Sequence, residues 1–275
     1  MGTLLKRTVY GLLFTAAVIA ALLSPWGLLV LVSLLSVLLC REYFRLVADR
    51  RFKKEMTCVS TASLVTLLLF FGHLRLGWDL RYVALGFVPL LAAHILLLYD
   101  AAEDHAFPTE LYFPFLYITL PLASLLRMGW PAGTYTWRLL LGLFILVWLN
   151  DIGAYCMGMS FGQREGSRKL FPALSPKKSW IGVFGGTLAS LLAAWAVYAT
   201  FGAGILPLVH WLALAAVASV FGVFGDLFES LLKRHANVKD AGQFIPGHGG
   251  LLDRFDDVLF VFPCAALYLS LFSLL

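Results

Sequence analysis

A succession of apolar runs, separated by short polar segments, constrains this chain more than any other feature. A helix needs about 20 apolar residues to cross a bilayer, or about 17 to 25 when tilt is allowed. Hydrophobic residues make up 60% of the sequence and charged residues 13%, whereas soluble domains carry about 25% charged residues. We therefore predict an all-α, polytopic integral membrane protein with about nine transmembrane helices. The expected spans are 8–23, 28–40, 57–72, 82–99, 111–126, 139–160, 181–201, 206–228 and 258–275.

The distribution of Lys and Arg predicts the orientation of these spans. Most of the 21 Lys and Arg residues fall at the N-terminus and in the segments 41–54, 164–178 and 233–254. Because short loops rich in Lys and Arg stay in the cytosol, we expect a cytosolic N-terminus and a C-terminus on the opposite side. The net charge of +5 reflects this basic rim, which suits anionic lipid headgroups. The basic residues form no continuous stripe, so nucleic acid is not an expected partner.

The most polar stretch, residues 225–257, lies just before the final apolar run. If the preceding run continues as a helix, Asp226, Ser230 and Lys233 lie on one face, because positions i, i+4 and i+7 share a face. The sequence thus predicts a polar helical face at the end of a membrane span.

A second group of carboxylates, Asp253, Asp256 and Asp257, opens the final run. The segment 246–250, Pro-Gly-His-Gly-Gly, cannot continue a helix, so the chain must fold back and bring these carboxylates towards Asp226. Carboxylates that converge beside Lys and Arg offer a site to a divalent cation such as Mg²⁺ and to the phosphates it carries. The alternative is a solvated, charged loop between two membrane helices.

The order of residues within this stretch is specific. It contains, at fixed spacing, Ser230, Leu232, Lys233, Arg234, Lys239, Asp240, Pro246, His248, Gly249, Gly250, Asp253, Arg254 and Asp256. This pattern resembles the signature of the phosphatidate cytidylyltransferases, also called CDP-diacylglycerol synthases. The resemblance extends upstream to Asn150-Asp151 and to Ser175-Pro176-Lys177-Lys178, so it covers the C-terminal half of the chain. The N-terminal half matches only in hydropathy and number of spans.

The resemblance implies an enzyme that transfers the cytidylyl group of CTP to phosphatidate, giving CDP-diacylglycerol and pyrophosphate. The expected catalytic residues are Asp226, Asp253, Lys233, Arg234 and Asp256. Mg²⁺ would be held by Asp226, Asp253 and Asp256, and a second cation is left open. The expected substrate-binding residues are Ser230, Lys239, Asp240, His248, Gly249, Gly250, Ser175, Lys177, Lys178, Asn150 and Asp151.

Asn150 and Asp151 lie in the middle of the apolar run 139–160. An ionisable residue at that depth is costly and usually functional, so we predict a polar cavity that opens to the cytosol and is lined by this pair. A structural hydrogen bond between helices is the alternative. Three glycines further along would let other helices approach closely: Gly153, Gly158 and Gly162.

The segment around Lys177 and Lys178 precedes a new apolar run, with Ser175 and Ser179 nearby. Cations near a helix N-terminus favour phosphate, although they could equally anchor the loop in the cytosol. The family commonly has Glu where this chain has Ile181, so no role of that acid is carried over.

We expect an N-terminal transmembrane scaffold over 1–138 and a catalytic transmembrane region over 139–275 with cytosolic loops 162–180 and 229–257. The small size resembles the bacterial branch of the family, which implies the inner membrane, and a homodimer is left open. One alternative is another CTP-dependent lipid enzyme, namely a polyprenol or phytol kinase or an archaeal CDP-lipid synthase. The other is a transporter or cation channel, which predicts polar residues spread over several spans and internal repeats. Neither pattern is evident here.

Overall fold

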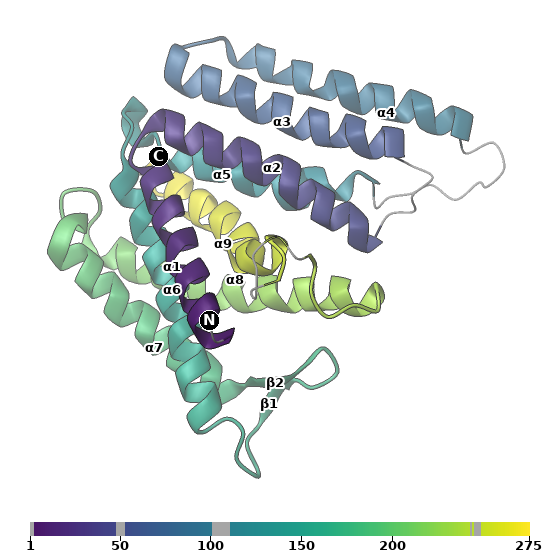
Figure 1. Cartoon of the computed structure of the whole chain (residues 1–275). Coiled ribbons are helices and arrows are strands. Elements are labelled where there is room, and N and C mark those ends of the chain that lie inside the picture. The colour runs from purple at the N-terminus through teal and green to yellow at the C-terminus, as the bar shows by residue number, and fades with distance from the viewer. Residues whose placement is uncertain (1–2, 48–52, 101–110, 243, 245–248) are drawn as a thin grey trace. The chain divides into compact units, whose positions relative to one another are not determined.

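The computed structural model describes residues 3–47, 53–100, 111–242, 244 and 249–275. These residues are almost entirely helical (Figure 1). The chain divides into two compact units. The first unit comprises Met1–Tyr135 and His235–Arg254, and the second comprises Thr136–Arg234 and Phe255–Leu275. Residues 235–254 thus group with the N-terminal helices.

In the first unit, α3 packs against α2, α4 and α5. Aromatic contacts join α3 to its neighbours, since the buried Phe71 of α3 contacts Trp26 of α2 and also the buried Trp130, with ring centroids 5.3 and 5.5 Å apart. The elements of this unit are α1 (Thr3–Leu22), α2 (Pro25–Val47), α3 (Lys53–Leu76), η2 (Leu80–Gly86), α4 (Phe87–Asp100), η4 (Phe115–Thr119), α5 (Leu120–Met128) and η5 (Pro131–Gly133).

A buried hydroxyl network links three helical elements of the first unit. Ser36 on α2 and Ser63 on α3 are hydrogen-bonded, with their Oγ atoms 2.8 Å apart. Thr119, at the end of η4, donates its hydroxyl to Ser63 Oγ at 2.7 Å. Polar side chains that face each other inside an apolar bundle hold helices together because they have no water to bond to instead.

The second unit is built around the close packing of α6 and α7. Its elements are α6 (Trp137–Ser160), β1 (Lys169–Phe171), β2 (Ser175–Ser179), α7 (Trp180–Val197), η6 (Tyr198–Gly202), α8 (Leu208–His235) up to Arg234, and α9 (Leu252–Leu271) from Phe255 onwards. A Cβ atom added to Gly153 of α6 would lie 2.6 Å from the carbonyl oxygen of Gly185 on α7. Gly158 faces Gly182 in the same contact. The expected close approach of another helix at these glycines is confirmed.

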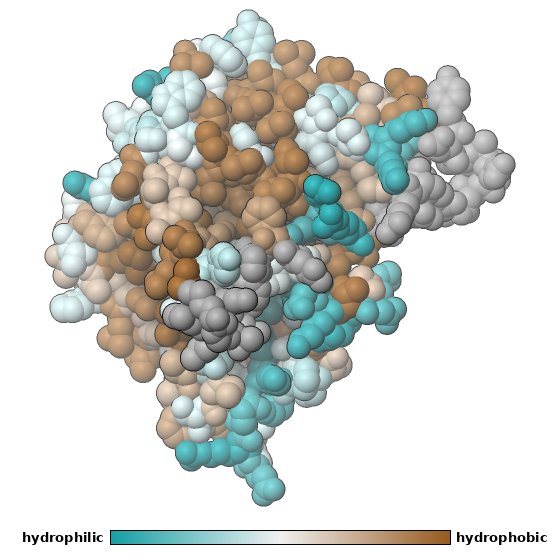
Figure 2. Space-filling view, viewed as in Figure 1, coloured by the Kyte–Doolittle hydropathy of each residue, from teal (hydrophilic) through white to brown (hydrophobic). Residues whose placement is uncertain are grey.

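The segment 162–180 forms a β-hairpin in which β1 and β2 pair antiparallel, with Lys169 opposite Ser179 and Phe171 opposite Ser175. Ser179 ends β2 and caps α7, because its hydroxyl accepts a hydrogen bond from the Gly182 amide at 3.2 Å. Hydrophilic residues gather over this hairpin at the bottom of the view in Figure 2.

Five helical segments are long and apolar enough to cross a membrane: Pro25–Val47, Lys53–Leu76, Trp137–Ser160, Trp180–Gly202 and Leu208–His235. Shorter apolar helices cover Thr8–Leu22, Leu80–Leu96 and Phe115–Met128. Hydrophobic residues also cover much of the visible surface (Figure 2). A helical membrane protein is therefore confirmed, while the count of nine spans and the sides of the two termini stay predictions.

We expect Ser63→Ala to lower the midpoint of thermal unfolding in detergent, because it leaves the Ser36 and Thr119 hydroxyls without their shared partner. Hydrogen bonds between membrane helices contribute about 0.6 to 2 kcal/mol each. Thr61→Ala is the matched control on α3, since the Thr61 hydroxyl is exposed and donates only to its own helix, at Thr57. Equal midpoints for the two variants would contradict a stabilising role of the network.

Candidate active site

Three carboxylates of the second unit converge and are called here the carboxylate cluster: Asp226, Asp256 and Asp257. One oxygen from each lies within 4.8 Å of the others. α8 carries Asp226, and α9 carries the two consecutive aspartates. From the sequence, both Asp256 and Asp257 are expected to approach Asp226, but only Asp256 is assigned as a metal ligand.

The cluster forms because the backbones of α8 and α9 approach closely at Gly225. A Cβ atom on this glycine would lie 2.4 Å from the carbonyl oxygen of Asp256 and 2.9 Å from Cα of Asp257. Gly222, one turn earlier on α8, has more room, since its Cβ would be 3.7 Å from Cβ of Asp257 and 3.8 Å from Nδ2 of Asn150. Gly225 therefore sets how near Asp226 comes to the two aspartates of α9.

The polar pair in α6 lies beside the cluster. Asp151 is within hydrogen-bonding reach of the Asp257 side chain. Asn150 is buried, with 5% of its surface exposed, and its Oδ1 has no hydrogen-bond partner among the described residues. The structure thus brings the polar pair of α6 to the carboxylates of α8 and α9, while the polar cavity open to the cytosol stays a prediction.

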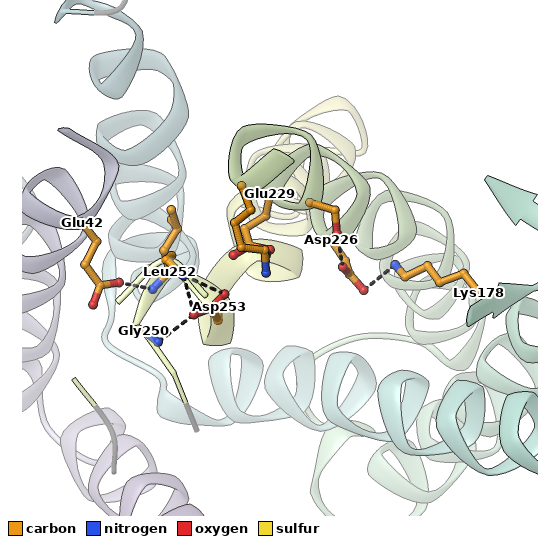
Figure 3. Close-up of polar contacts among 10 residues, drawn as sticks. Glu42, Lys178, Asp226, Glu229, Gly250, Leu252 and Asp253 are labelled. Atoms are coloured by element: carbon orange, nitrogen blue, oxygen red, sulfur yellow. Dashed lines mark hydrogen bonds and ion pairs between the residues drawn. The ribbon is translucent and has the colours of Figure 1, made fainter. Parts of the chain in front are cut away.

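Lys178 of β2 forms an ion pair with Asp226 (Figure 3). Asp226 also accepts a hydrogen bond from Ser230 at 3.4 Å, which confirms that these two residues share a helical face. Lys177, the next residue along the strand, is exposed, and its carbonyl oxygen accepts a hydrogen bond from Gln163 at 2.8 Å. Of the two lysines, Lys178 is the one that lies at the carboxylate cluster.

A second ion pair lies one turn further along α8, between Glu229 and Lys233. Only 1% of the Glu229 side chain and 14% of the Lys233 side chain is exposed. Arg234, by contrast, is exposed. A buried charge requires a partner, so this pair fixes the position of the Lys233 ammonium group.

In the first unit, Asp253 contacts backbone amides. Its carboxylate accepts hydrogen bonds from the amides of Ala241 at 3.1 Å and Gly250 at 2.7 Å. Gly249 has a φ of +86°, a conformation that favours glycine. The role of Asp253 as a metal ligand beside Asp226 stays a prediction. Lys239 and Asp240 are exposed, and His248 lies outside the described residues.

Glu42 was not identified from the sequence. It is buried in α2, and its carboxylate accepts a hydrogen bond from the amide of Leu252 at 2.7 Å (Figure 3). An acid near the end of an apolar span could have drawn attention to Glu42. The neighbouring Arg41 and Arg45, however, favoured the interpretation of this segment as a basic, cytosolic anchor of the span.

The carboxylate cluster suits a divalent cation of the Mg²⁺ class. Hard oxygens are the ligands that Mg²⁺ prefers. Three carboxylates at this distance repel one another unless a cation or protons compensate them. In addition, Oδ1 of Asn150 and Oδ1 of Asp257 are buried without a hydrogen-bond partner among the described residues. The Asp257 oxygen is available to a bound ion or to its water, whereas Oδ1 of Asn150 faces Gly186 on α7.

The fold and the site together define a polytopic helical membrane protein with a candidate metal and phosphate centre built from α8 and α9. The chain belongs to the cytidylyltransferase family, whose model matches residues 5–272. It is 44% identical over 129 residues to a phosphatidate cytidylyltransferase of Bacillus subtilis (strain 168), covering 47% of this chain and 46% of that protein.

Two further relatives carry the same name. The protein of Staphylococcus epidermidis (strain ATCC 12228) is 46% identical over 128 residues, and that of Staphylococcus aureus (strain COL) is 44% identical over 122 residues. The matches cover 46% of both chains for the first and 44% of both for the second. This chain thus spans about half the length of the curated relatives that it matches.

We expect Gly225→Ala to destabilise the protein, because its new methyl group meets backbone atoms of Asp256 and Asp257 that cannot move without displacing α9. Overpacking of this kind costs about 1 to 3 kcal/mol, more than the gain of about 1 kcal/mol of alanine over glycine in a helix. Gly222→Ala is the matched control, since its methyl group makes only ordinary contacts. Thermal unfolding in detergent compares the two, and a Gly225→Ala midpoint at or above that of Gly222→Ala contradicts the expectation.

Proposed function

We propose that this protein transfers the cytidylyl group of CTP to phosphatidate, giving CDP-diacylglycerol and pyrophosphate. The observation that carries the proposal is the carboxylate cluster with Lys178 at its edge, in a chain of the cytidylyltransferase family. The names of the relatives support phosphatidate as the acceptor.

The reaction joins two anions. A phosphate oxygen of phosphatidate attacks the α-phosphorus of CTP, the bond from that phosphorus to the α–β bridging oxygen breaks, and pyrophosphate leaves. The attacking oxygen is already ionised near neutral pH, so a strong general base is not required. Repulsion between the two polyanions is the main obstacle, and fixed cations with well-placed ligands reduce it by screening and alignment.

Mg²⁺ would be held by Asp226, Asp256 and Asp257, with Asp253 retained as a further ligand from the sequence expectation. When bound, the ion would neutralise phosphate charge and align the triphosphate. Lys178 can exchange its ion pair with Asp226 for a phosphate oxygen, since both partners are anions.

The other charged residues have complementary roles in the proposal. Lys233, held by Glu229, would contact the triphosphate together with Arg234 and Lys239. Asn150 and Asp151 would line the polar cavity beside the carboxylate cluster.

A lipid acceptor accounts for the membrane fold. The acyl chains of phosphatidate remain in the cytosolic leaflet while its headgroup reaches the cluster. We propose that the site faces the cytosol of a bacterial inner membrane, with the N-terminus on that side and the C-terminus on the other, because most Lys and Arg residues lie on one side of the predicted spans. Nine spans remain part of this proposal.

The deciding experiment incubates the purified protein in detergent with labelled CTP and phosphatidate, with and without Mg²⁺, and identifies the products. CDP-diacylglycerol and pyrophosphate support the proposal. Release of CDP with phosphorylation of a polyprenol or phytol indicates a lipid kinase instead. Light scattering of the same preparation distinguishes a monomer from a homodimer.

We expect Asp226→Asn and Asp257→Asn each to lower the rate of CDP-lipid formation by at least about a hundredfold, the usual cost of removing one group that stabilises transition-state charge. Glu165→Gln is the control, since Glu165 is an exposed acid in the segment before β1. Near-normal turnover in either aspartate variant, at normal levels in the membrane, would exclude these residues as metal ligands.

A direct test of metal binding uses no substrate. Mg²⁺ at about 100 times its Kd would stabilise the folded protein by about 2.7 kcal/mol, so the thermal midpoint should rise with Mg²⁺ concentration in the wild type and in Glu165→Gln. The rise should shrink or vanish in Asp257→Asn. An identical Mg²⁺ response in all three proteins would place the binding site elsewhere.

A further inference from the structure

Glu42 is a buried carboxylate in a membrane-spanning helix, and its partner is the backbone of a distant segment. Only 5% of its surface is exposed, and Oε2 accepts a hydrogen bond from the amide of Leu252, the first residue of α9, at 2.7 Å (Figure 3). A buried carboxylate is costly unless hydrogen bonds compensate it. The first amides of a helix are suitable donors because they have no partner within the helix.

Both oxygens of Glu42 lie against glycines near the ends of the segment before α9. A Cβ atom on Gly242 would be 2.5 Å from Oε1, and one on Gly250 would be 2.7 Å from Oε2. The space that a side chain would occupy at these positions is therefore taken by the Glu42 carboxylate. Gly250 belongs to the pattern that resembles the family signature, so this contact gives a physical reason for glycine there.

The Asp253 carboxylate also contacts both parts of this segment. Its carboxylate accepts hydrogen bonds from Ala241, next to Gly242, and from Gly250. Two carboxylates, one from α2 and one from α9, thus hold residues 241–242 and 249–252, which we call the loop ends. Residues 243 and 245–248 between them lie outside the described part of the chain.

We propose that Glu42 is a positioning residue for nucleotide binding: it fixes the loop ends so that Gly249 and Gly250 keep the conformation that receives the phosphates of CTP. The inference rests on the proposed function, because the ligand of this loop is taken from it. Glu42 does not itself touch the nucleotide in this account. It acts through the amide of Leu252 and through its contacts with Gly242 and Gly250.

The first test compares Glu42→Ala with Glu42→Gln. Removing one charge-assisted hydrogen bond to a buried group changes an equilibrium by about tenfold or more, so Glu42→Ala should raise the KM for CTP by at least that factor, with a smaller change in kcat. Glu42→Gln keeps an oxygen acceptor of the same length and should recover part of the loss. Glu55→Gln is the control, since Glu55 is a buried glutamate of the same unit on α3 and should leave the KM for CTP unchanged.

A second variant, Gly242→Ala, disturbs the same contact from the side of the loop. The methyl group of Gly242→Ala would meet Oε1 of Glu42, so this variant should raise the KM for CTP as Glu42→Ala does. If both act through one contact, the double variant should be no worse than Glu42→Ala, because coupled substitutions are not additive. Additive effects in the double variant would contradict a shared contact.

Amide hydrogen exchange provides a readout that does not depend on activity. Peptides covering 241–252 should exchange faster in Glu42→Ala than in the wild type or in Glu55→Gln. Faster exchange with an unchanged KM for CTP would overturn the positioning role, and unchanged exchange would overturn the contact itself. Failure of the proposed function would be distinguishable, because it appears as absence of CDP-lipid formation in the wild type. The exchange experiment would still test the contact between Glu42 and the loop ends.

Discussion

The second unit depends on the close approach of α8 and α9 at Gly225, which gathers three carboxylates into a small volume. A Cβ atom at this position would meet the backbone of Asp256, so the spacing of the cluster is fixed by the backbone and not by side-chain rotamers. Negative charges gathered in an apolar surrounding are unfavourable without compensation. A divalent cation would supply this compensation, and the proposed chemistry on phosphates depends on it.

Compensation of buried charge is a common theme in both units, and it is achieved in different ways. Lys178 pairs with Asp226, and Lys233 pairs with the buried Glu229. Glu42 instead accepts a hydrogen bond from a helix N-terminus. Lys178 can exchange Asp226 for an anionic substrate, whereas the Glu42 carboxylate is buried against the segment that it holds. The difference separates groups suited to bind a ligand from groups suited to hold a loop.

Sequence reasoning predicted the helical membrane fold because hydropathy is a local property of each run. It also placed Asp226 and Ser230 on one face, since that depends only on helical period. It did not assign Asp257 as a ligand, because adjacent aspartates cannot be ranked without knowing which one faces α8. Glu42 was not found because its partner, Leu252, is 210 residues away. The β1–β2 hairpin was expected as a loop, since its short strands carry no clear alternation.

In the proposed function, the ion pair between Lys178 and Asp226 would couple two binding events. A cation that coordinates Asp226 competes with Lys178 for the same carboxylate and so releases its ammonium group. A phosphate that attracts Lys178 conversely exposes Asp226 to a cation. Each ligand therefore raises the affinity for the other by the same factor, as thermodynamic linkage requires. One lysine at the end of a hairpin would in this way make metal and nucleotide binding cooperative without any large rearrangement of the helices.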